Sequence, residues 1–319
     1  MPAAQILMPA PMADDVVAAL DDRFMLHRLW EQDDREGFLR SVAPDIRGLA
    51  VSTLAGRIDA AWFDRLPALE IVASFGVGYD NVDAGAAAGR GIVVTNTPGV
   101  LDDEVADLAV GLLLATLRRI PQADRFVREG RWADGAFPLS PTLRGRRVGI
   151  LGLGAIGKAI AHRLAAFGVS IGYHGRSRQD GVDYRYYVTT VALAEASDVV
   201  MAVVPGGSGT RHLVDADVLA ALGPDGVLIN VSRGSVVDER ALVAALLDGT
   251  IGGAGLDVFE NEPQVPEALL AMPNVVLLPH IGSASHATRA AMGRLVVENL
   301  TTWFDEGRAL TPVPETSRR

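Results

Sequence analysis

The stretch "VGILGLGAIGKAIAHRLAAFG", residues Val148–Gly168, decides the fold of the second half of this 319-residue chain. Its first residues, Val148–Leu151, form an apolar run that predicts a buried strand, and apolar side chains at helical spacing follow "GLGAIG". Between strand and helix stand Gly152, Gly154 and Gly157, in the spacing G-x-G-x-x-G. The spacing alone is weak evidence, but a strand before it and a helix after it indicate a Rossmann dinucleotide site.

Each glycine of this motif has a physical task. Gly152 permits a tight turn, Gly154 lets the backbone approach a pyrophosphate, and Gly157 lets the helix pack on the strand. The helix then begins at Ala155 and Ile156, where unpaired N–H groups and a partial positive charge favour phosphate. The alternative is a glycine-rich turn that binds nothing, which the ordered strand, motif, helix and second strand make the weaker interpretation.

The next strand ends in an unusual way for such a site. An Asp or Glu there commonly holds the adenine ribose 2′-hydroxyl, but this strand runs "VSIGYHGRSRQD" and places His174 and then Arg176, Ser177 and Arg178 at its end. A carboxylate would repel a 2′-phosphate, whereas arginine grips phosphate bidentately and serine donates its hydroxyl. The sequence therefore predicts NADP(H) as the preferred cofactor, with NAD(H) possible; ordinary solvated loop charges are the alternative.

Short β-branched runs alternate with helical patterns along the whole chain, which is typical of α/β proteins with parallel sheets. We expect two Rossmann-like, doubly wound domains. A flavodoxin-like substrate (catalytic) domain comprises residues 1–99 and 285–319, and a dinucleotide-binding domain, residues 100–284, is inserted within it. Pro121 predicts a break after the long helix that begins near Asp102, and the tail "TPVPETSRR" is expected to be disordered.

Composition narrows the classes of partner. The formal net charge is −10, which argues against nucleic acid or an anionic membrane as a partner, because both need a basic surface. An anionic substrate would need a local positive group. The chain has no cysteine, which excludes disulfides and thiolate metal sites, and no targeting segment is visible, so a cytoplasmic location is the simple interpretation.

Three residues that follow later strands suggest a reaction. Arg233, Glu262 and His280 each come just after an apolar run, and ligands of open parallel sheets bind outside the carboxyl ends of the strands. Reduction of a 2-keto acid needs a carboxylate clamp, for which Arg233 is suited, and a proton donor, for which His280 is suited. Glu262 would favour the imidazolium and fix its tautomer. Each residue taken singly has a simpler interpretation as a surface charge, a turn or a structural histidine.

The remaining polar candidates have smaller roles. Asp257 is better placed to hold a nicotinamide carboxamide than to do chemistry. His286 is interpreted as solvated, and His27, His162 and His212 have no partner pattern. No H-x-x-x-H or H-E-x-x-H spacing occurs, so no metal is expected.

The segments "SFGVGYDNVD", "GILGLGAIG", "NVSRGSVVDE", "GAGLDVFENEP" and "PHIGSAS" together resemble the D-isomer-specific 2-hydroxyacid dehydrogenases, in that family's order, from Ser74 to Ser285. The resemblance implies Arg233, Glu262 and His280 as the catalytic triad, substrate carboxylate on the backbone amides of Val77 and Gly78, and a homodimer through the cofactor domains. Ser283 is a further predicted substrate contact. The further predicted cofactor contacts are Val204, Pro205, Thr210, Val231, Ser232 and Gly282.

Within the family, "YHGRSR" is similar to the NADP-preferring glyoxylate/hydroxypyruvate reductase branch. The loop "EGRWADGAFPLS" is similar to one that reaches toward the neighbour's substrate pocket, so Trp132, Phe137 and Leu139 are either specificity residues or an apolar dimer contact. We predict NADPH-dependent reduction of small keto acids such as glyoxylate and hydroxypyruvate. The alternatives are bulkier aryl-pyruvates or pyruvate as substrate and, from another class, a nucleotide-sensing corepressor or scaffold.

Overall fold

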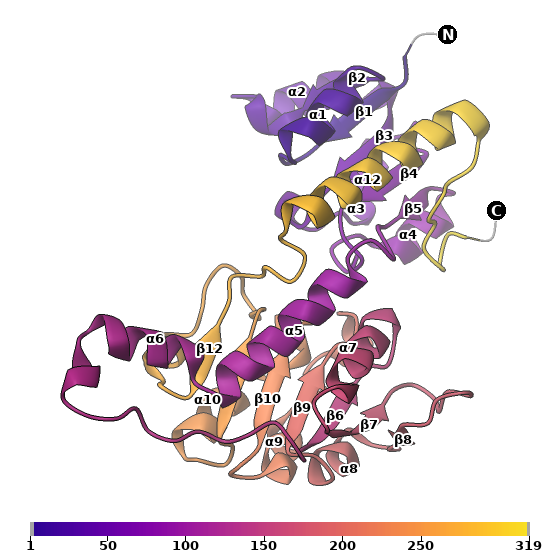
Figure 1. Cartoon of the computed structure of the whole chain (residues 1–319). Coiled ribbons are helices and arrows are strands. Elements are labelled where there is room, and N and C mark those ends of the chain that lie inside the picture. Colours follow the sequence, from indigo (N-terminus) through magenta and orange to yellow (C-terminus); the bar gives the residue numbers. More distant parts are fainter. Residues whose placement is uncertain (1–2, 318–319) are drawn as a thin grey trace. The chain divides into compact units, whose positions relative to one another are not determined.

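The computed structural model describes residues 3–317 of the chain, which divides into two compact units. Unit 1 comprises Met1–Leu101 and Ser285–Arg319, and unit 2 comprises Asp102–Ala284. Each unit contains one sheet whose strands pair in parallel, with helices packed against it (Figure 1). The predicted fold class, two doubly wound parallel α/β units, is confirmed.

The sheet of unit 1 has the order β2-β1-β3-β4-β5, the flavodoxin-like arrangement. Its strands are β1 Gln5–Met8, β2 Met25–Arg28, β3 Ile46–Val51, β4 Ile71–Ser74 and β5 Val93–Thr95. Its helices are α1 Asp14–Asp21, α2 Arg35–Val42, α3 Ala60–Arg65, α4 Ala84–Gly89 and α12 His286–Glu306. Side chains alternate across the strands: Ile6 and Met8 pack toward α1 and α12, and Leu7 packs with the cluster on the opposite face.

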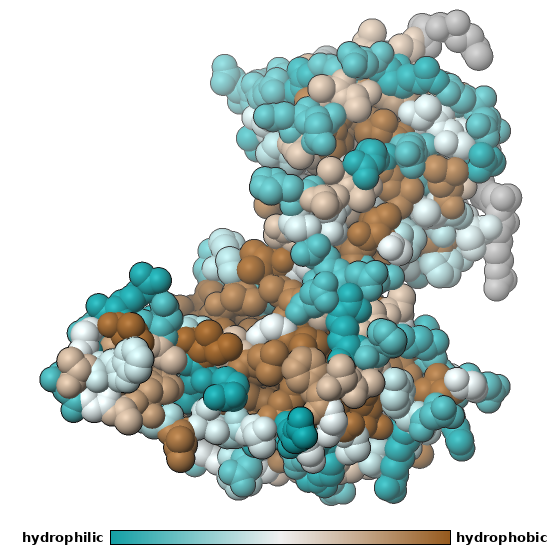
Figure 2. Space-filling model, in the orientation of Figure 1, coloured by the Kyte–Doolittle hydropathy of each residue, from teal (hydrophilic) through white to brown (hydrophobic). Residues whose placement is uncertain are grey.

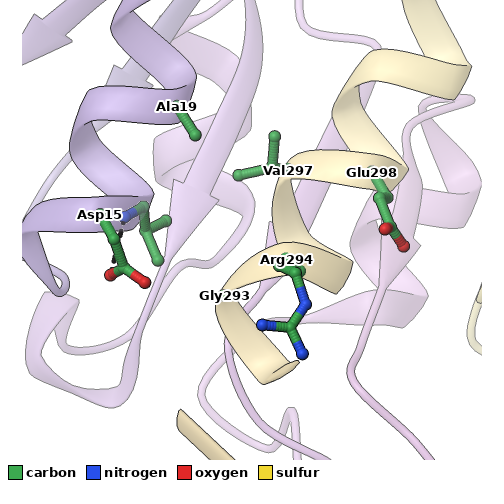
Figure 3. A pocket seen from close by; sticks show the side chains of 7 residues that line it. Asp15, Ala19, Gly293, Arg294, Val297 and Glu298 are labelled. Carbon is green, nitrogen blue, oxygen red and sulfur yellow. Dashed lines mark hydrogen bonds between the residues drawn. The ribbon is translucent and has the colours of Figure 1, made fainter. Parts of the chain in front are cut away.

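A small hollow lies between α1 and α12 (Figure 3). Figure 3 shows the apolar side chains of Ala19 and Val297 beside it, with the charged side chains of Asp15, Arg294 and Glu298 around them. The lining comes from these two helices of unit 1 alone. The hollow therefore contains none of the residues to which the sequence assigns chemistry.

The C-terminal tail differs from the sequence-based expectation. Instead of being disordered, it is ordered as far as Ser317 and adds to the edge of the sheet, where Pro312 pairs with Thr95 and Val313 is buried. The Thr316 hydroxyl accepts a hydrogen bond from the backbone N–H of Val94 at 3.1 Å. Amid the polar residues of this tail, Pro312 completes backbone pairing and Val313 completes core packing. The last two residues of the tail, 318–319, lie outside the described part.

The sheet of unit 2 has the order β12-β11-β10-β9-β6-β7-β8, with the reversal of strand order between β6 and β9. The strands are β6 Arg147–Leu151, β7 Ser170–His174, β8 Arg185–Tyr186, β9 Val199–Ala202, β10 Val227–Asn230, β11 Gly253–Leu256 and β12 Val275–Leu277. The helices are α5 Asp102–Leu117, α6 Ile120–Arg128, α7 Ala155–Ala165, α8 Thr190–Glu195, α9 Ala216–Leu222, α10 Glu239–Leu247 and α11 Glu267–Ala271. This is the strand order of a dinucleotide-binding sheet.

Two helices of unit 2 are tied together through an arginine. Arg163 of α7 donates hydrogen bonds to Asp103 at 3.0 Å and to Asp107 at 2.6 Å, both in α5. The predicted break at Pro121 is confirmed: α5 ends at Leu117, Arg119 adopts the left-handed conformation with φ 53°, and α6 starts at Ile120. The chain then enters segment 129–146, which precedes β6 and is mostly exposed apart from buried Leu143.

Candidate active site

The carboxyl ends of six neighbouring strands meet at one edge of the unit 2 sheet, because β6, β7, β9, β10, β11 and β12 pair in parallel. Nearly all of the predicted site residues of unit 2 follow these ends. The structure therefore brings to one edge residues that are more than a hundred positions apart in the chain. In open α/β sheets this edge is where ligands bind.

Arg233 lies three residues beyond β10 and is held in place by a buried asparagine. Asn230, 1% exposed, accepts hydrogen bonds from the N–H and hydroxyl of Ser232 and donates one to the backbone oxygen of Arg233 at 3.0 Å. A Cβ at Gly234 would lie 1.8 Å from the carbonyl carbon of Phe259. Only glycine permits this close approach, which packs the turn of Arg233 against the turn that carries Glu262.

Glu262 and His280 form a hydrogen-bonded pair. The Nδ1 atom of His280 lies 2.7 Å from Oε2 of Glu262, and Oε1 of Glu262 accepts the backbone N–H of Phe259 at 3.0 Å. Burial acts to raise the pKa of Glu262, but the hydrogen bond and charge of His280, the Phe259 amide and the charge of Arg233 outweigh it and lower the pKa below its ordinary value. An ionised Glu262 fixes the histidine ring and leaves its Nε2 for other partners.

His280 has a left-handed backbone, with φ 54°, which is uncommon for a residue with a side chain. Buried Asp257 holds this turn, because its two carboxylate oxygens accept the backbone N–H groups of Ile281 and Gly282, each at 2.8 Å, and its backbone oxygen accepts the N–H of His280. Burial raises the pKa of Asp257, and these two amide hydrogen bonds oppose that rise. Asp257 thus supports the histidine turn; the predicted contact with a nicotinamide carboxamide stays a prediction.

Glu260, two residues before Glu262, has charged and polar partners that the sequence patterns did not indicate. Glu260 accepts hydrogen bonds from Arg211 at 2.5 Å and from Nε2 of His212 at 3.0 Å, and its backbone N–H is bound by the buried carboxylate of Glu239. The sequence shows no partner pattern for His212 or His27, but the structure gives both a partner: His27 Nε2 lies 2.7 Å from Oε1 of Gln5 in unit 1. The available signal was the acidic pair in "FENEP", of which only Glu262 was chosen.

The glycine motif has the geometry that a pyrophosphate requires. Gly152 has φ 100°, and a Cβ there would lie 2.9 Å from the backbone oxygen of Val203. A Cβ on Gly157 would lie 2.2 Å from the backbone oxygen of Gly152, whereas the position of Gly154 opens onto free space. Gly154 is also the N-cap of α7, so the amides of Ala155 and Ile156 stand at a helix N-terminus. The residues present fit a dinucleotide.

The segment after β7, which we call the arginine loop (residues 175–179), carries the predicted 2′-phosphate contacts. Arg176, Ser177 and Arg178 are all exposed, as a group that meets an incoming phosphate must be. His174 at the end of β7 directs Nδ1 to the backbone oxygen of Tyr187 at 2.9 Å, and is thereby fixed at the base of the loop. No acidic side chain occupies positions 174–179.

The remaining predicted contacts divide between the two units. In unit 2, the predicted positions at or just beyond the strand ends are Val204, Pro205, Thr210, Val231, Ser232, Gly282 and Ser283. The Thr210 hydroxyl donates to the backbone oxygen of Pro205 at 2.7 Å, which closes that loop on itself. Val77 and Gly78 lie in unit 1, in the loop after β4, where Asn96 donates a hydrogen bond to the backbone oxygen of Val77 at 2.8 Å; their role with substrate stays a prediction.

Within residues 3–317, no three His, Asp or Glu side chains gather in a way that would hold a metal ion. Over the same range, no helix combines the length and the apolar character needed to cross a membrane. What the edge of unit 2 does offer is the guanidinium of Arg233 and the carboxylate-bound imidazole of His280, at the same edge of the sheet as the N-terminus of α7. Such an arrangement is able to bind an anion and give a proton to an oxygen beside it; we call Arg233, Glu262 and His280 the catalytic edge.

Comparison with known proteins gives consistent results. The family model described as D-isomer specific 2-hydroxyacid dehydrogenase, NAD binding domain, matches residues 110–282. The chain is 49% identical over 313 residues to a hydroxyphenylpyruvate reductase of Plectranthus scutellarioides, covering 98% of this chain and 100% of that protein. It is 48% identical over 308 residues to a glyoxylate/hydroxypyruvate reductase of Arabidopsis thaliana, covering 97% and 98% of the two chains.

A solved structure is also similar over nearly the full length. It is the NADPH-dependent glyoxylate/hydroxypyruvate reductase of Sinorhizobium meliloti in complex with NADP and malonate, with a TM-score of 0.92 and 55% sequence identity over 98% of each chain.

Proposed function

This chain belongs to the D-isomer-specific 2-hydroxyacid dehydrogenase family, and we propose that it reduces small 2-keto acids, glyoxylate and hydroxypyruvate first, to 2-hydroxy acids with NADPH. The predicted family and enzyme class are confirmed by the family match and by the reductases that the chain resembles over its length. The observation that carries the proposed reaction is the Glu262–His280 pair at 2.7 Å, beside the positive charge of Arg233.

The proposed mechanism assigns one task to each residue of the catalytic edge. Arg233 binds the carboxylate of the keto acid and polarises the carbonyl next to it, which supplies the local positive charge that a chain of net charge −10 needs. NADPH, held by the glycine motif and the arginine loop, would supply the hydride. His280 gives a proton from Nε2 to the carbonyl oxygen, while Glu262 holds Nδ1 and stabilises the imidazolium before that transfer. In the reverse direction, the hydride of the 2-hydroxy acid would pass to NADP⁺, and His280 would accept the proton of its hydroxyl group.

The choice of NADPH rests on the arginine loop. Two guanidinium groups and a hydroxyl stand where NAD-dependent sites commonly place a carboxylate, so a 2′-phosphate meets attraction in place of repulsion. The similar reductase from Sinorhizobium meliloti is described as NADPH-dependent and was solved with NADP. We assign cofactor binding to unit 2, and NADH remains a weaker substitute.

A bulkier keto acid is the second candidate substrate. The observation in its favour is the 49% identity to a hydroxyphenylpyruvate reductase, whose name indicates an aromatic keto acid as substrate. Trp132, Phe137 and Leu139 are the candidates for selecting between the two substrate sizes. The corepressor alternative is disfavoured, since the full-length relatives named above are reductases.

The segment that carries these three residues also supports a homodimer. Trp132 is 69% exposed and Leu139 is fully exposed, and the rings of Phe126 and Phe137 pack edge to face beside them. Over the end of unit 2 where α6 lies, Figure 2 shows hydrophobic side chains among hydrophilic ones. Exposed apolar groups gathered on one arm favour burial against a second copy. A cytoplasmic location, where NADPH is kept reduced, remains a prediction.

Initial rates test the proposed function. Glyoxylate, hydroxypyruvate and hydroxyphenylpyruvate are compared, each with NADPH and NADH at equal concentrations. We expect turnover with the first two and a higher kcat/KM with NADPH. Turnover of hydroxyphenylpyruvate alone would select the second candidate, and no turnover of any keto acid would contradict the proposal.

A further inference from the structure

The backbone of the arginine loop is anchored by two residues to which the site gives no other role. The backbone N–H of Gln179 donates to the hydroxyl of Tyr173 at 2.8 Å, and its side-chain Nε2 donates to the backbone oxygen of Leu153 at 2.8 Å. Leu153 is the middle residue of "GLG" in the glycine motif. Gln179 is the last residue of the arginine loop, and its side chain therefore links this loop to the turn that would receive the pyrophosphate.

The anchor is built from the core of unit 2. Tyr173 is 1% exposed, and its ring packs against Tyr186 of β8 with ring centroids 5.3 Å apart. The hydroxyl of Tyr186 in turn donates to the backbone oxygen of Gly175 at 3.3 Å, at the start of the loop. Both ends of the loop thus bond to tyrosine hydroxyls, one from the buried end of β7 and one from the short strand beside it.

We propose that Tyr173 and Gln179 are positioning residues for cofactor selection: they hold the arginine loop so that Arg176, Ser177 and Arg178 reach the 2′-phosphate of NADPH while the glycine motif holds the pyrophosphate. The inference rests on the proposed use of NADPH. It goes beyond that proposal because neither residue belongs to the predicted set of phosphate contacts, and Tyr173 is buried.

The physical reason is the entropy of ordering an exposed loop. Arginine side chains are long and mobile, and a bidentate grip on phosphate needs their backbone at a fixed place. If the loop had to become ordered on binding, the entropic cost of ordering it would offset part of the binding free energy from the new hydrogen bonds. A loop that is already ordered before binding avoids this cost. NADH has no 2′-phosphate, so its binding gains little from the order of this loop.

Two variants test the inference, Tyr173→Phe and Gln179→Ala. Calorimetry measures binding of adenosine 2′,5′-bisphosphate and of 5′-AMP, and steady-state rates with hydroxypyruvate give KM for NADPH and NADH. We expect binding of the bisphosphate to weaken by about threefold to tenfold, the scale of one lost hydrogen bond. KM for NADPH should rise by a similar factor, while kcat and the affinity for 5′-AMP stay near the wild-type values.

Gln122→Ala is the matched control. Its side-chain Nε2 also donates to backbone oxygens of unit 2, of Pro273 at 3.0 Å and Val275 at 3.3 Å, but away from the arginine loop. Thermal melts establish that each variant folds, and Gln179→Ala keeps the test valid if the buried Tyr173→Phe does not. The control should bind both nucleotides as the wild type does.

The outcomes separate the inference from the proposal on which it rests. If the wild type does not distinguish the bisphosphate from 5′-AMP, both fail. If the wild type does distinguish them and Arg176→Ala/Arg178→Ala removes the difference, the proposed cofactor choice stands. The inference is then overturned if folded Tyr173→Phe and Gln179→Ala bind the bisphosphate like the wild type, or if they lose both nucleotides equally.

Discussion

The catalytic edge and the arginine loop lie at strand ends of the same sheet but are built in different ways. In the catalytic edge, buried polar side chains fix two of the three residues: Asn230 holds the turn of Arg233, and Asp257 holds the turn of His280. The third, Glu262, is held by the backbone N–H of Phe259 and by His280. In the arginine loop, the charged side chains are exposed, and only their backbone is anchored, through Tyr173 and Gln179.

This difference follows from what each region must do. Proton transfer needs a donor within hydrogen-bond distance of one atom, so a misplacement of an ångström is costly. Attraction of a 2′-phosphate tolerates mobile side chains, provided that their charge and their backbone are in place. We therefore expect changes in the catalytic edge to affect both cofactors alike, and changes in the arginine loop to affect NADPH alone.

Substitution of the proton donor gives the largest expected effect. In His280→Gln, kcat should fall by about 10²- to 10⁴-fold, the range of general acid catalysis. The factor should be the same with NADPH and NADH, and binding of NADPH should be nearly unchanged. His162→Gln, on the exposed side of α7, is the matched control. If His280→Gln kept its turnover, another group would have to donate the proton, and the catalytic edge would no longer be the site of proton transfer.

The second effect is expected in the arginine loop. Arg176→Ala/Arg178→Ala should raise KM for NADPH by about tenfold to a hundredfold, because hydrogen bonds to charged groups are lost. KM for NADH and kcat should change little. Arg240→Ala, an exposed arginine of α10, controls for the loss of positive charge on unit 2. Equal weakening of both cofactors would show that the loop does not select the 2′-phosphate.

The third effect concerns the carboxylate clamp. Arg233→Lys should raise KM for hydroxypyruvate by about tenfold, because a point charge does not reproduce a bidentate grip. KM for NADPH should stay at the wild-type value, and Arg240→Lys should leave both constants unchanged. A rise in KM for NADPH instead would mean that Arg233 contacts the cofactor. The catalytic edge and the arginine loop would then not differ in their effect on cofactor binding.

The fold class and much of the candidate site were predictable because the sequence patterns that indicate them are local. The glycine motif, the apolar strands and the residues that come just after them are each contained in a few adjacent letters, and parallel pairing alone brings such residues to one edge. This is why the fold class and the positions of Arg233, Glu262 and His280 on neighbouring strand ends were predictable.

The supporting residues were not predictable in the same way, because they depend on contacts between distant segments. Nothing adjacent to Gln179 indicates that its side chain bonds to Leu153, 26 positions earlier. The hydrogen bond between His212 and Glu260, and the position of the tail residue Val313 in the core, also depend on such distant contacts. The polar residues of the tail suggested disorder, whereas its pairing with β5, the burial of Val313 and the hydrogen bond of Thr316 with Val94 show that it is ordered.

The smallest expected effect is a pH dependence of stability in the catalytic edge. The folded pKa of Glu262 lies below its ordinary value of 4.5, so ionised Glu262 contributes stability that is present above pH 4.5 and lost as the pH falls through the lower folded pKa. Glu262→Gln keeps the shape of the side chain but not this charge. The free energy of unfolding should therefore differ between wild type and variant at pH 5 to 6, and the difference should shrink toward pH 3.

The difference should be about 1 kcal/mol or less, because the side chain of Glu262 is 34% exposed and solvent screens the pair. Urea unfolding at several pH values measures it, with Glu267→Gln of α11 as the control for one exposed carboxylate. Arg176→Ala/Arg178→Ala should leave this pH dependence unchanged, since its charges belong to the other region. A difference that grows as the pH falls would mean that Glu262 is strained by burial more than it is stabilised by His280. In that case its place beside the histidine would have to be explained by catalysis alone.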